Sequence, residues 1–240
     1  MLSKNEIKYI QSLSHKKFRD SFNLFLAEGP KIVSELVQLI PDQIEKIYAT
    51  EEWLQDNKVI HPGVTVISEQ ELERISQLQT PNQVLATVKK KELPPISDNG
   101  FTIYLDTIQD PGNFGTIIRT ADWFGISQIV CTAGCADLYQ PKVVQSTMAS
   151  IARVNVYYDD QCSWLKNQQQ PVYAAVLDGN PVEKAARVNN GVLIIGNESK
   201  GISPELMNYA TEKITISKKG EAESLNAAVA TGILLSYLVS

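Results

Sequence analysis

Short apolar segments alternate along this chain with segments of helical periodicity, and this alternation limits the possible folds more than any other feature. In the C-terminal half, runs of branched aliphatic residues predict strands, and the intervening segments place apolar residues three or four positions apart. The predicted strands are 101–106, 127–131, 154–157, 171–176, 191–195 and 213–216, and the predicted helices are 113–124, 141–148, 160–168, 203–210 and 225–239. This order predicts an α/β fold with a mostly parallel sheet and helices on both faces.

The N-terminal half alternates in the same way over shorter elements. Its predicted helices are 3–13, 30–39, 51–55 and 69–75, and its predicted strands are 24–29, 44–49, 64–67 and 83–88. Residues 89–100, KKKELPPISDNG, combine three lysines with two prolines, which is typical of a linker. We therefore expect a small α/β domain over 1–92, a linker over 93–99 and a second domain over 100–240.

Charge and hydropathy exclude several classes of protein. The 240 residues carry a net charge of −5, which argues against bulk, non-specific binding of nucleic acid. The charge is uneven, because residues 1–19 hold five cations and only Glu6 as an anion. This basic leader either contacts phosphate or forms an ordinary solvated helix face. The sequence has no apolar run of membrane-spanning length and no apolar signal core, so we expect a cytoplasmic protein.

Cysteine and histidine are too few and too scattered for a structural framework. The cysteines are Cys131, Cys135 and Cys162, and the histidines are His15 and His61. Three cysteines do not make a set of disulfides, and no histidine lies near them in sequence. We therefore expect neither a disulfide scaffold nor a metal site.

The segment Asp110–Gly125, DPGNFGTIIRTADWFG, follows a predicted buried strand and contains the first polar turn. Asn113 is a candidate N-cap, because its side-chain oxygen can accept from free N–H groups of the first helical turn. Ile117, Ala121 and Phe124 recur on one face and are expected in the core. Arg119 lies about 200° round the helix from Ile117, so it is either a functional cation or a solvated surface arginine.

Two further polar turns follow predicted strands, at 196–203 and 217–224. Ligands of parallel sheets bind beyond the carboxyl ends of the strands, where these turns and 107–113 lie. The second turn lacks the phosphate-loop lysine, because Ile202 stands at that position, and the chain has no G-x-G-x-x-G. A close backbone approach at Gly196 and the carboxylate of Glu198 remain; Glu198 could also simply favour a helix start. In the third turn, Ser224 is a candidate cap for the last helix.

Together, the three turns resemble the motifs of the SpoU (TrmH-like) class of SPOUT RNA methyltransferases. The first is Asn113-x5-Arg119-Thr-Ala121. The second is the strand 193–195 followed by Gly196-x-Glu198-x-x-Gly201. The third is Ile216-x8-Leu225, within Ser224-Leu225-Asn226. The resemblance covers about residues 101–240. In the N-terminal half, residues 25–30, FLAEGP, resemble the "EG" segment of the substrate-binding domain in the same class.

The resemblance implies a fold, a cofactor and a reaction. The sheet would contain a deep trefoil knot, through which the last helix is threaded. The cofactor would be S-adenosylmethionine, with no metal, and the assembly would be a homodimer. The methyl group would go to a ribose 2′-hydroxyl of ribosomal or transfer RNA. By motif position, the cofactor contacts would be Ile195, Gly196, Gly201, Ile216 and Leu225.

The resemblance also implies catalytic roles. The arginine of the first motif, Arg119, would activate the hydroxyl. Because guanidinium keeps its proton up to a pKa above about 12, we hypothesise that Arg119 gathers a phosphate and stabilises the developing alkoxide. Asn113 and Glu198 would orient Arg119 and the RNA backbone, and Ser224 and Asn226 would complete the polar wall.

The sequence is also compatible with two alternative functions. The chain could be a non-catalytic RNA-binding or ribosome assembly factor on the same fold, or a SPOUT enzyme that methylates a base. RNA capture by an acidic chain would depend on local cations, and the candidates besides the basic leader are Lys142, Lys200, Lys218 and Lys219.

Overall fold

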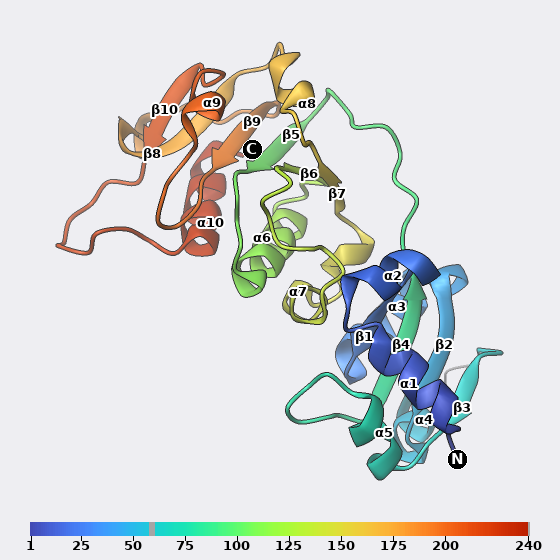
Figure 1. Ribbon diagram of the computed structural model, residues 1–240. Coiled ribbons are helices and arrows are strands. Elements are labelled where there is room, and N and C mark those ends of the chain that lie inside the picture. The colour runs from blue at the N-terminus through green and yellow to red at the C-terminus, as the bar shows by residue number, and fades with distance from the viewer. Residues whose placement is uncertain (58–60, 240) are drawn as a thin grey trace. The chain divides into compact units, whose positions relative to one another are not determined.

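The structure, a computed structural model, describes residues 1–57 and 61–239 and divides into two compact units (Figure 1). The first unit contains Met1–Glu92 together with Asp137–Ala152. The second contains Leu93–Ala136 and the chain from Arg153 onward. The segment 137–152, which lies between two strands of the second unit in sequence, therefore packs with the first.

The first unit is built on a mixed sheet with strand order β1-β4-β2-β3. Its strands are β1 (Leu24–Glu28), β2 (Ile44–Ala49), β3 (Val64–Val66) and β4 (Val84–Lys89). Strand β4 runs antiparallel to β1 and β2, and β2 runs parallel to β3. Its helices are α1 (Lys4–Ser12), α2 (Lys16–Phe22), α3 (Pro30–Leu39), α4 (Glu51–Asn57), α5 (Glu69–Ile75) and α7 (Pro141–Thr147), with 3-10 turns at Pro41–Gln43 and Ser150–Ala152.

Apolar side chains from α1, α5 and the sheet form one core of this unit. Ile10 of α1, Ile75 of α5 and Leu26 of β1 belong to the same buried cluster. Helix α3 buries Ile32 and its neighbours outside this cluster, against β1 and β4. Helix α1 begins one residue after the predicted start of 3–13. Ser3 is its N-cap, because the Ser3 hydroxyl accepts a hydrogen bond from the Glu6 N–H at 3.2 Å. Helix α2 is not among the predicted elements; it has seven residues, and no side chain caps its first turn.

A buried carboxylate explains the "EG" segment of this unit. Glu28 ends β1 and is 5% exposed. It accepts hydrogen bonds from the Ser76 hydroxyl at 2.5 Å and from the Gln77 N–H at 3.0 Å. Gly29 follows with φ of +90°, a conformation that glycine adopts without strain. Glu28 therefore ties the end of β1 to the loop after α5, and burial raises the pKa of its carboxyl group.

The second unit is built on a sheet with strand order β10-β8-β9-β5-β6-β7, in which every described neighbouring pair is parallel. Its strands are β5 (Phe101–Leu105), β6 (Gln128–Cys131), β7 (Asn155–Tyr158), β8 (Val172–Pro181), β9 (Gly191–Ile195) and β10 (Glu212–Thr215). Its helices are α6 (Pro111–Trp123), α8 (Ser163–Lys166), α9 (Pro204–Met207) and α10 (Ala227–Leu238), with a 3-10 turn at Val182–Lys184. The central strands β5 and β9 are buried throughout, as expected of a sheet covered on both faces.

Helices cover both faces of this sheet, which confirms the predicted α/β architecture. Leu165 of α8 and Leu206 of α9 share a buried cluster with Tyr104 and Ile194 on one face. Helices α6 and α10 pack against each other and are drawn side by side in Figure 1. Alternate strand residues such as Ile103 point away from the cluster and are fully buried, so they line the opposite face.

Both helix caps proposed for the second unit are wrong by a few residues. Helix α6 begins at Pro111, where a proline sacrifices no hydrogen bond, and its N-cap is Asp110 instead of Asn113. The Asp110 carboxylate accepts from the Asn113 N–H at 2.7 Å. Helix α10 is capped by Asn226, not by Ser224, because the Asn226 side-chain oxygen accepts from two N–H groups of the first turn. The side chain of Asn113 is thereby free for other contacts.

Across the described part of the chain, no helix combines the length and the hydropathy needed to cross a bilayer.

We expect Glu28→Gln to change how stability depends on pH. Because the pKa of Glu28 is raised in the folded state, its contribution to the unfolding free energy is present below the unfolded pKa. That contribution is lost as the pH rises through the folded pKa. The wild type should therefore lose stability relative to Glu28→Gln between acid and neutral pH. Urea unfolding at several pH values measures this, with Glu73→Gln at an exposed position of α5 as the control. Parallel curves for wild type and Glu28→Gln would contradict the prediction.

Candidate active site

Three turns of the second unit lie at one edge of its sheet. They follow β5, β9 and β10, which end at Leu105, Ile195 and Thr215. Because the strands are parallel, their carboxyl ends meet at the same edge, where ligands of such sheets bind. All three sequence motifs therefore contribute to one region of the molecule.

A chain of hydrogen bonds joins one polar side chain from each turn. The Asn113 amide N–H donates to Glu198 Oε1 at 2.7 Å. The Asn226 amide N–H in turn donates to Asn113 Oδ1 at 2.8 Å. The side-chain oxygen of Asn226 is also hydrogen-bonded, because it accepts from the N–H groups of Ala228 and Val229. The structure thus brings together three of the candidate residues, which are far apart in sequence.

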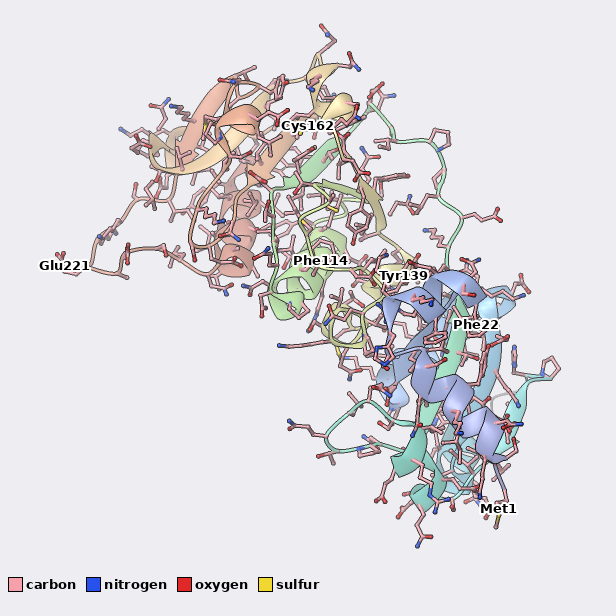
Figure 2. The ribbon with its side chains drawn as sticks, viewed as in Figure 1. Met1, Phe22, Phe114, Tyr139, Cys162 and Glu221 are labelled. Carbon is pink, nitrogen blue, oxygen red and sulfur yellow. The ribbon has the colours of Figure 1, made fainter. Side chains whose placement is uncertain are left out.

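Arg119 and Ser224 are not part of this chain of hydrogen bonds. Arg119 is exposed on α6, off the buried stripe formed by Ile117 and Ala121. In the described residues its guanidinium has no hydrogen bond or ion pair, so its donors are available to a ligand. Ser224 lies in the exposed segment 217–226, whose Glu221 is labelled in Figure 2.

The second turn depends on two glycines. A Cβ atom on Gly196 would lie 2.3 Å from the backbone carbonyl carbon of Gly201, a distance that no side chain tolerates. Gly201 has φ of +67° and exchanges two backbone hydrogen bonds with Asn197, at 3.0 and 2.9 Å. The turn therefore folds back on itself with its backbone exposed to a ligand.

Two residues that the sequence analysis did not select hold this turn to β5. The Asn197 amide donates to the Thr107 carbonyl at 2.8 Å, and its Oδ1 accepts from the Ser199 and Lys200 N–H groups. Asp106 is 4% exposed and accepts from the Ser203 N–H at 2.7 Å. The sequence offers only weak signals for these two residues: Asn197 follows a glycine, and Asp106 follows the end of a strand. Both patterns also occur in ordinary turns.

The cysteines near the first turn act as hydrogen-bond partners. The Cys135 sulfur accepts from the Ile108 N–H at 3.2 Å, and the Thr132 hydroxyl accepts from the Thr107 N–H at 3.0 Å. The hydrogen bond with Cys131 lowers the pKa of the Cys135 thiol, and the Ile108 N–H acts in the same direction. Burial raises the pKa of Cys131. These contacts fix the backbone of the turn after β5.

The candidate cofactor residues lie in the second and third turns and offer backbone groups and apolar side chains. Ile195 is buried at the end of β9, and Ile216 is half-buried after β10. Leu225 is 46% exposed, so an apolar side chain stands open beside the polar Asn226. Exposed backbone next to an open apolar side chain fits a nucleoside, which needs both hydrogen bonds and an apolar contact. In residues 1–57 and 61–239, no cluster of three or more His, Cys, Asp or Glu could hold a metal ion.

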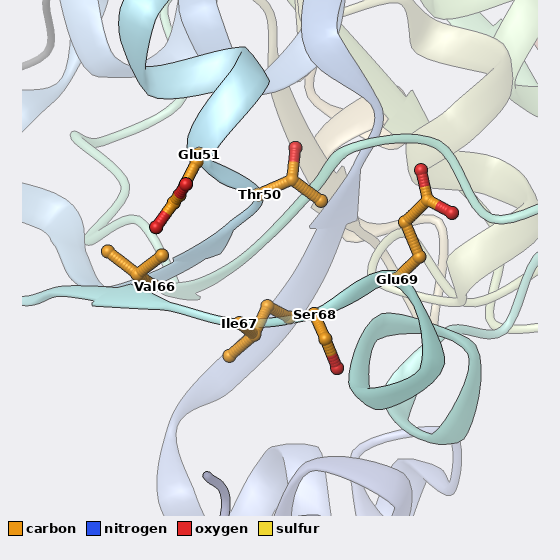
Figure 3. Close-up of a pocket in the computed structure, with 6 residues that line it drawn as sticks. All are labelled: Thr50, Glu51, Val66, Ile67, Ser68 and Glu69. Carbon is orange, nitrogen blue, oxygen red and sulfur yellow. The ribbon is translucent and has the colours of Figure 1, made fainter.

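A separate pocket in the first unit offers different chemistry. It lies where β2 and β3 end and α4 and α5 begin (Figure 3), and it is lined by Thr50, Glu51, Val66, Ile67, Ser68 and Glu69. Two glutamates with no cation in the lining disfavour an anionic ligand such as an RNA backbone.

Comparison with known proteins gives matches over both halves of the chain. Residues 100–236 match the model of the SpoU rRNA Methylase family, and residues 4–86 match the MRM3-like substrate binding domain. The 23S rRNA (guanosine(2553)-2′-O)-methyltransferase RlmP of Bacillus subtilis is 30% identical over 98% of this chain and 97% of its own.

Solved structures match over the same length. A TrmH-family protein from Porphyromonas gingivalis superposes with a TM-score of 0.89 and 38% identity, covering 100% of this chain and 98% of that one. An AdoMet-bound rRNA methyltransferase from Sinorhizobium meliloti gives a TM-score of 0.85 and 30% identity, covering 99% and 95%.

We expect Asn197→Ala to loosen the second turn and to lower the unfolding free energy by about 1–3 kcal/mol, because several polar groups lose their partner. Chemical denaturation of the two proteins measures the difference. Asn208→Ala, an exposed asparagine after α9, is the control and should change stability by less than about 0.5 kcal/mol. Equal effects of the two substitutions would show that Asn197 does not hold the turn.

Proposed function

Because the chain belongs to the SpoU rRNA methylase family, we propose that it transfers the methyl group of S-adenosylmethionine to a ribose 2′-hydroxyl of ribosomal or transfer RNA. The resemblance predicted from the three motifs is confirmed by the family match over residues 100–236. RlmP of Bacillus subtilis, similar over nearly its whole length, is a 23S rRNA 2′-O-methyltransferase. The observation that carries the proposal is the hydrogen-bonded set Glu198, Asn113 and Asn226 beside the exposed backbone of the second turn.

S-adenosylmethionine supplies an electrophilic methyl group on a sulfonium, so the protein has to activate the acceptor. A ribose 2′-hydroxyl is a weak acid and a poor nucleophile at neutral pH. Its oxygen forms the bond to the methyl carbon as the sulfur–carbon bond breaks, and its proton leaves to water. The guanidinium of Arg119 contacts a substrate phosphate and stabilises the negative charge that develops on the oxygen. Because guanidinium keeps its proton, this role is electrostatic.

The remaining polar residues line the part of the site that faces the RNA substrate. Glu198 and Asn226 fix the Asn113 amide from its two sides, so the orientation of the amide is set before RNA binds. Ser224, in the exposed segment before α10, completes the polar lining of the site. The cofactor is held by Ile195, Gly196 and Gly201 from the second turn and by Ile216 and Leu225 from the third.

We also propose a deep trefoil knot in the second unit. The match of residues 100–236 to the SpoU family model supports it, because the motifs of this class imply such a knot.

We further propose which residues capture RNA and where in the cell the enzyme acts. Domain 1–92 binds structured RNA, supported by its match to a substrate-binding domain over residues 4–86. Lys142, Lys200, Lys218 and Lys219 are exposed and add positive charge. Since the proposed substrates are ribosomal and transfer RNA, we place the enzyme in the cytoplasm.

We further propose a homodimer formed through α6 and α10. These neighbouring helices leave apolar side chains in water: Trp123 is 86% exposed, Val229 52% and Tyr237 42%. Val229, Ile233 and Tyr237 are spaced i, i+4, i+8 and form one stripe on α10. Large apolar side chains grouped on adjacent helices are typical of a protein interface.

The activity is tested with labelled S-adenosylmethionine and unmodified ribosomal and transfer RNA, followed by alkaline hydrolysis. A 2′-O-methyl group blocks attack on the adjacent phosphate, so ribose methylation leaves a labelled, alkali-resistant dinucleotide. Label found only in mononucleotides would instead identify a base methyltransferase. Binding of cofactor and RNA without any transfer of label would favour the non-catalytic assembly factor.

In the same assay, Arg119→Ala should lower kcat/KM by at least about a hundredfold, because a preorganised donor to a developing oxyanion is lost. Arg119→Lys keeps the charge but loses the planar pair of donors, so we expect a loss of at least about tenfold. Arg187→Ala, an exposed arginine of the same unit, is the control and should keep its activity. Near-normal activity of Arg119→Lys would contradict planar recognition by Arg119.

For the dimer, we expect Trp123→Glu to produce monomers, because a charge would be buried at the interface. Sedimentation velocity at several concentrations measures the assembly state. The matched control is Leu39→Glu, which places the same charge at a 43% exposed leucine on α3. The interface is excluded if Trp123→Glu and the control sediment alike as dimers, or if the wild type is a monomer.

A further inference from the structure

Four aromatic rings form a row across α2 and α1 of the first unit. The Phe18 and Phe22 rings are nearly parallel, with centroids 6.3 Å apart and an interplanar angle of 16°. His15 meets Phe18 edge-on at 6.4 Å, and Tyr9 of α1 meets Phe22 edge-on at 5.0 Å. Phe18 and Phe22 are 38% and 44% exposed, so the middle of this aromatic row faces water. Figure 2 labels Phe22 beside these helices.

The helix that carries the aromatic row is rigidly held on its other side. Arg19 lies between the two phenylalanines in sequence, yet it is only 2% exposed. Its guanidinium donates to the carbonyls of Leu13 and Ser14 at 3.0 and 2.7 Å, and it pairs with Asp137 at 3.0 Å. The position of the exposed rings is thus fixed before any partner binds, which lowers the entropy cost of binding.

The helices that carry the aromatic row also carry exposed positive charge. The acidic residues of α1 and α2 are already neutralised, because Glu6 pairs with Lys46 and Asp20 pairs with Lys16 and Lys90. In the described part of the chain, Lys4, Lys8 and Lys17 are exposed lysines of these helices without an ion-pair partner.

One further carboxylate lies near the row. Glu45 raises the pKa of Tyr9 by its negative charge, but only after the larger effect of burial. The Glu45 carboxylate already accepts a hydrogen bond from the Thr87 hydroxyl at 2.8 Å. It therefore lies at the Tyr9 end of the row, whereas Lys17 adjoins Phe18 in sequence.

We propose that the aromatic row is a stacking platform for unpaired RNA bases, with Lys8 and Lys17 contacting the flanking phosphates. Exposed parallel rings beside lysines are the combination that binds single-stranded nucleic acid, because every base has a flat face to stack. Bases within a duplex are already stacked and cannot reach the rings. The inference rests on the proposed function, since it names which part of an RNA substrate the first unit recognises.

The platform is tested by equilibrium binding of the full-length protein to two RNA probes. One is a single-stranded oligonucleotide with an internal 2-aminopurine, and the other is the same sequence in a complete duplex. Phe18→Leu and Phe22→Leu keep a large apolar side chain and do not lower the helix propensity, but they remove the flat ring. Each should weaken single-strand binding by about 5- to 100-fold, and duplex binding by less than about twofold. Stacking should also change the 2-aminopurine fluorescence with the wild type and less with the variants.

Controls separate stacking from charge and from folding. Leu39→Ala removes an exposed apolar side chain elsewhere in the unit and should not alter binding of either probe. Lys17→Gln should weaken binding and reduce its salt dependence, because one phosphate contact is lost. Circular dichroism and thermal unfolding establish that the leucine variants are folded.

Two results would overturn the platform: unchanged single-strand affinity in the folded leucine variants, or equal losses for both probes. Failure of the wild type to bind either probe would also overturn it and would favour a protein partner for the row. These outcomes are distinct from failure of the proposed function, which is judged by the alkali-resistant dinucleotide alone. If methyl transfer is observed, the leucine variants should raise KM for ribosomal RNA and leave kcat unchanged.

Discussion

The two hydrogen bonds of the Asn113 side chain are the contacts on which the candidate site depends. An amide offers a donor and an acceptor a short distance apart, so one asparagine can join a carboxylate from one loop to an amide from another. Asn113 donates to Glu198 and accepts from Asn226. For this to occur, α6 has to begin at Pro111 with Asp110 as its cap, which leaves the Asn113 side chain free. The side chain of Asn226 also has two roles: its oxygen caps α10, and its N–H donates to Asn113.

The second turn is shaped by a close contact between backbone segments. Because Gly196 has no Cβ atom, its backbone can pack directly against that of Gly201. The hydrogen bonds of Asn197 and Asp106 then hold the turn to the end of β5. The second turn therefore places polar groups, among them the buried Asp106 carboxylate, beside a largely apolar sheet. Each of these groups has a partner, which is the condition under which burial of polar atoms is tolerated.

Buried charged side chains also order the first unit. Arg19 is a buried cation satisfied by two carbonyls and Asp137, and it holds α2 so that Phe18 and Phe22 remain exposed. Glu28 plays the equivalent anchoring role for the loop after α5. In both cases a charged residue next to an apolar strand or helix has a structural role. The residues available to a ligand are the ones left in water.

Local pattern in the sequence was sufficient for the α/β class, for elements such as α3 and β2, and for the family. Apolar periodicity is a property of neighbouring residues, so it can be recognised without knowledge of the tertiary contacts. Helix starts were less well determined, because Asp110 and Asn113, or Ser224 and Asn226, are equally good caps by type. The seven-residue α2 escaped detection because packing of Arg19 and its ion pair, more than propensity, stabilises it. Only the tertiary structure decided that Asn113, Glu198 and Asn226 meet, and that segment 137–152 packs with the first unit, because contacts between distant residues depend on how the strands are ordered in the sheet.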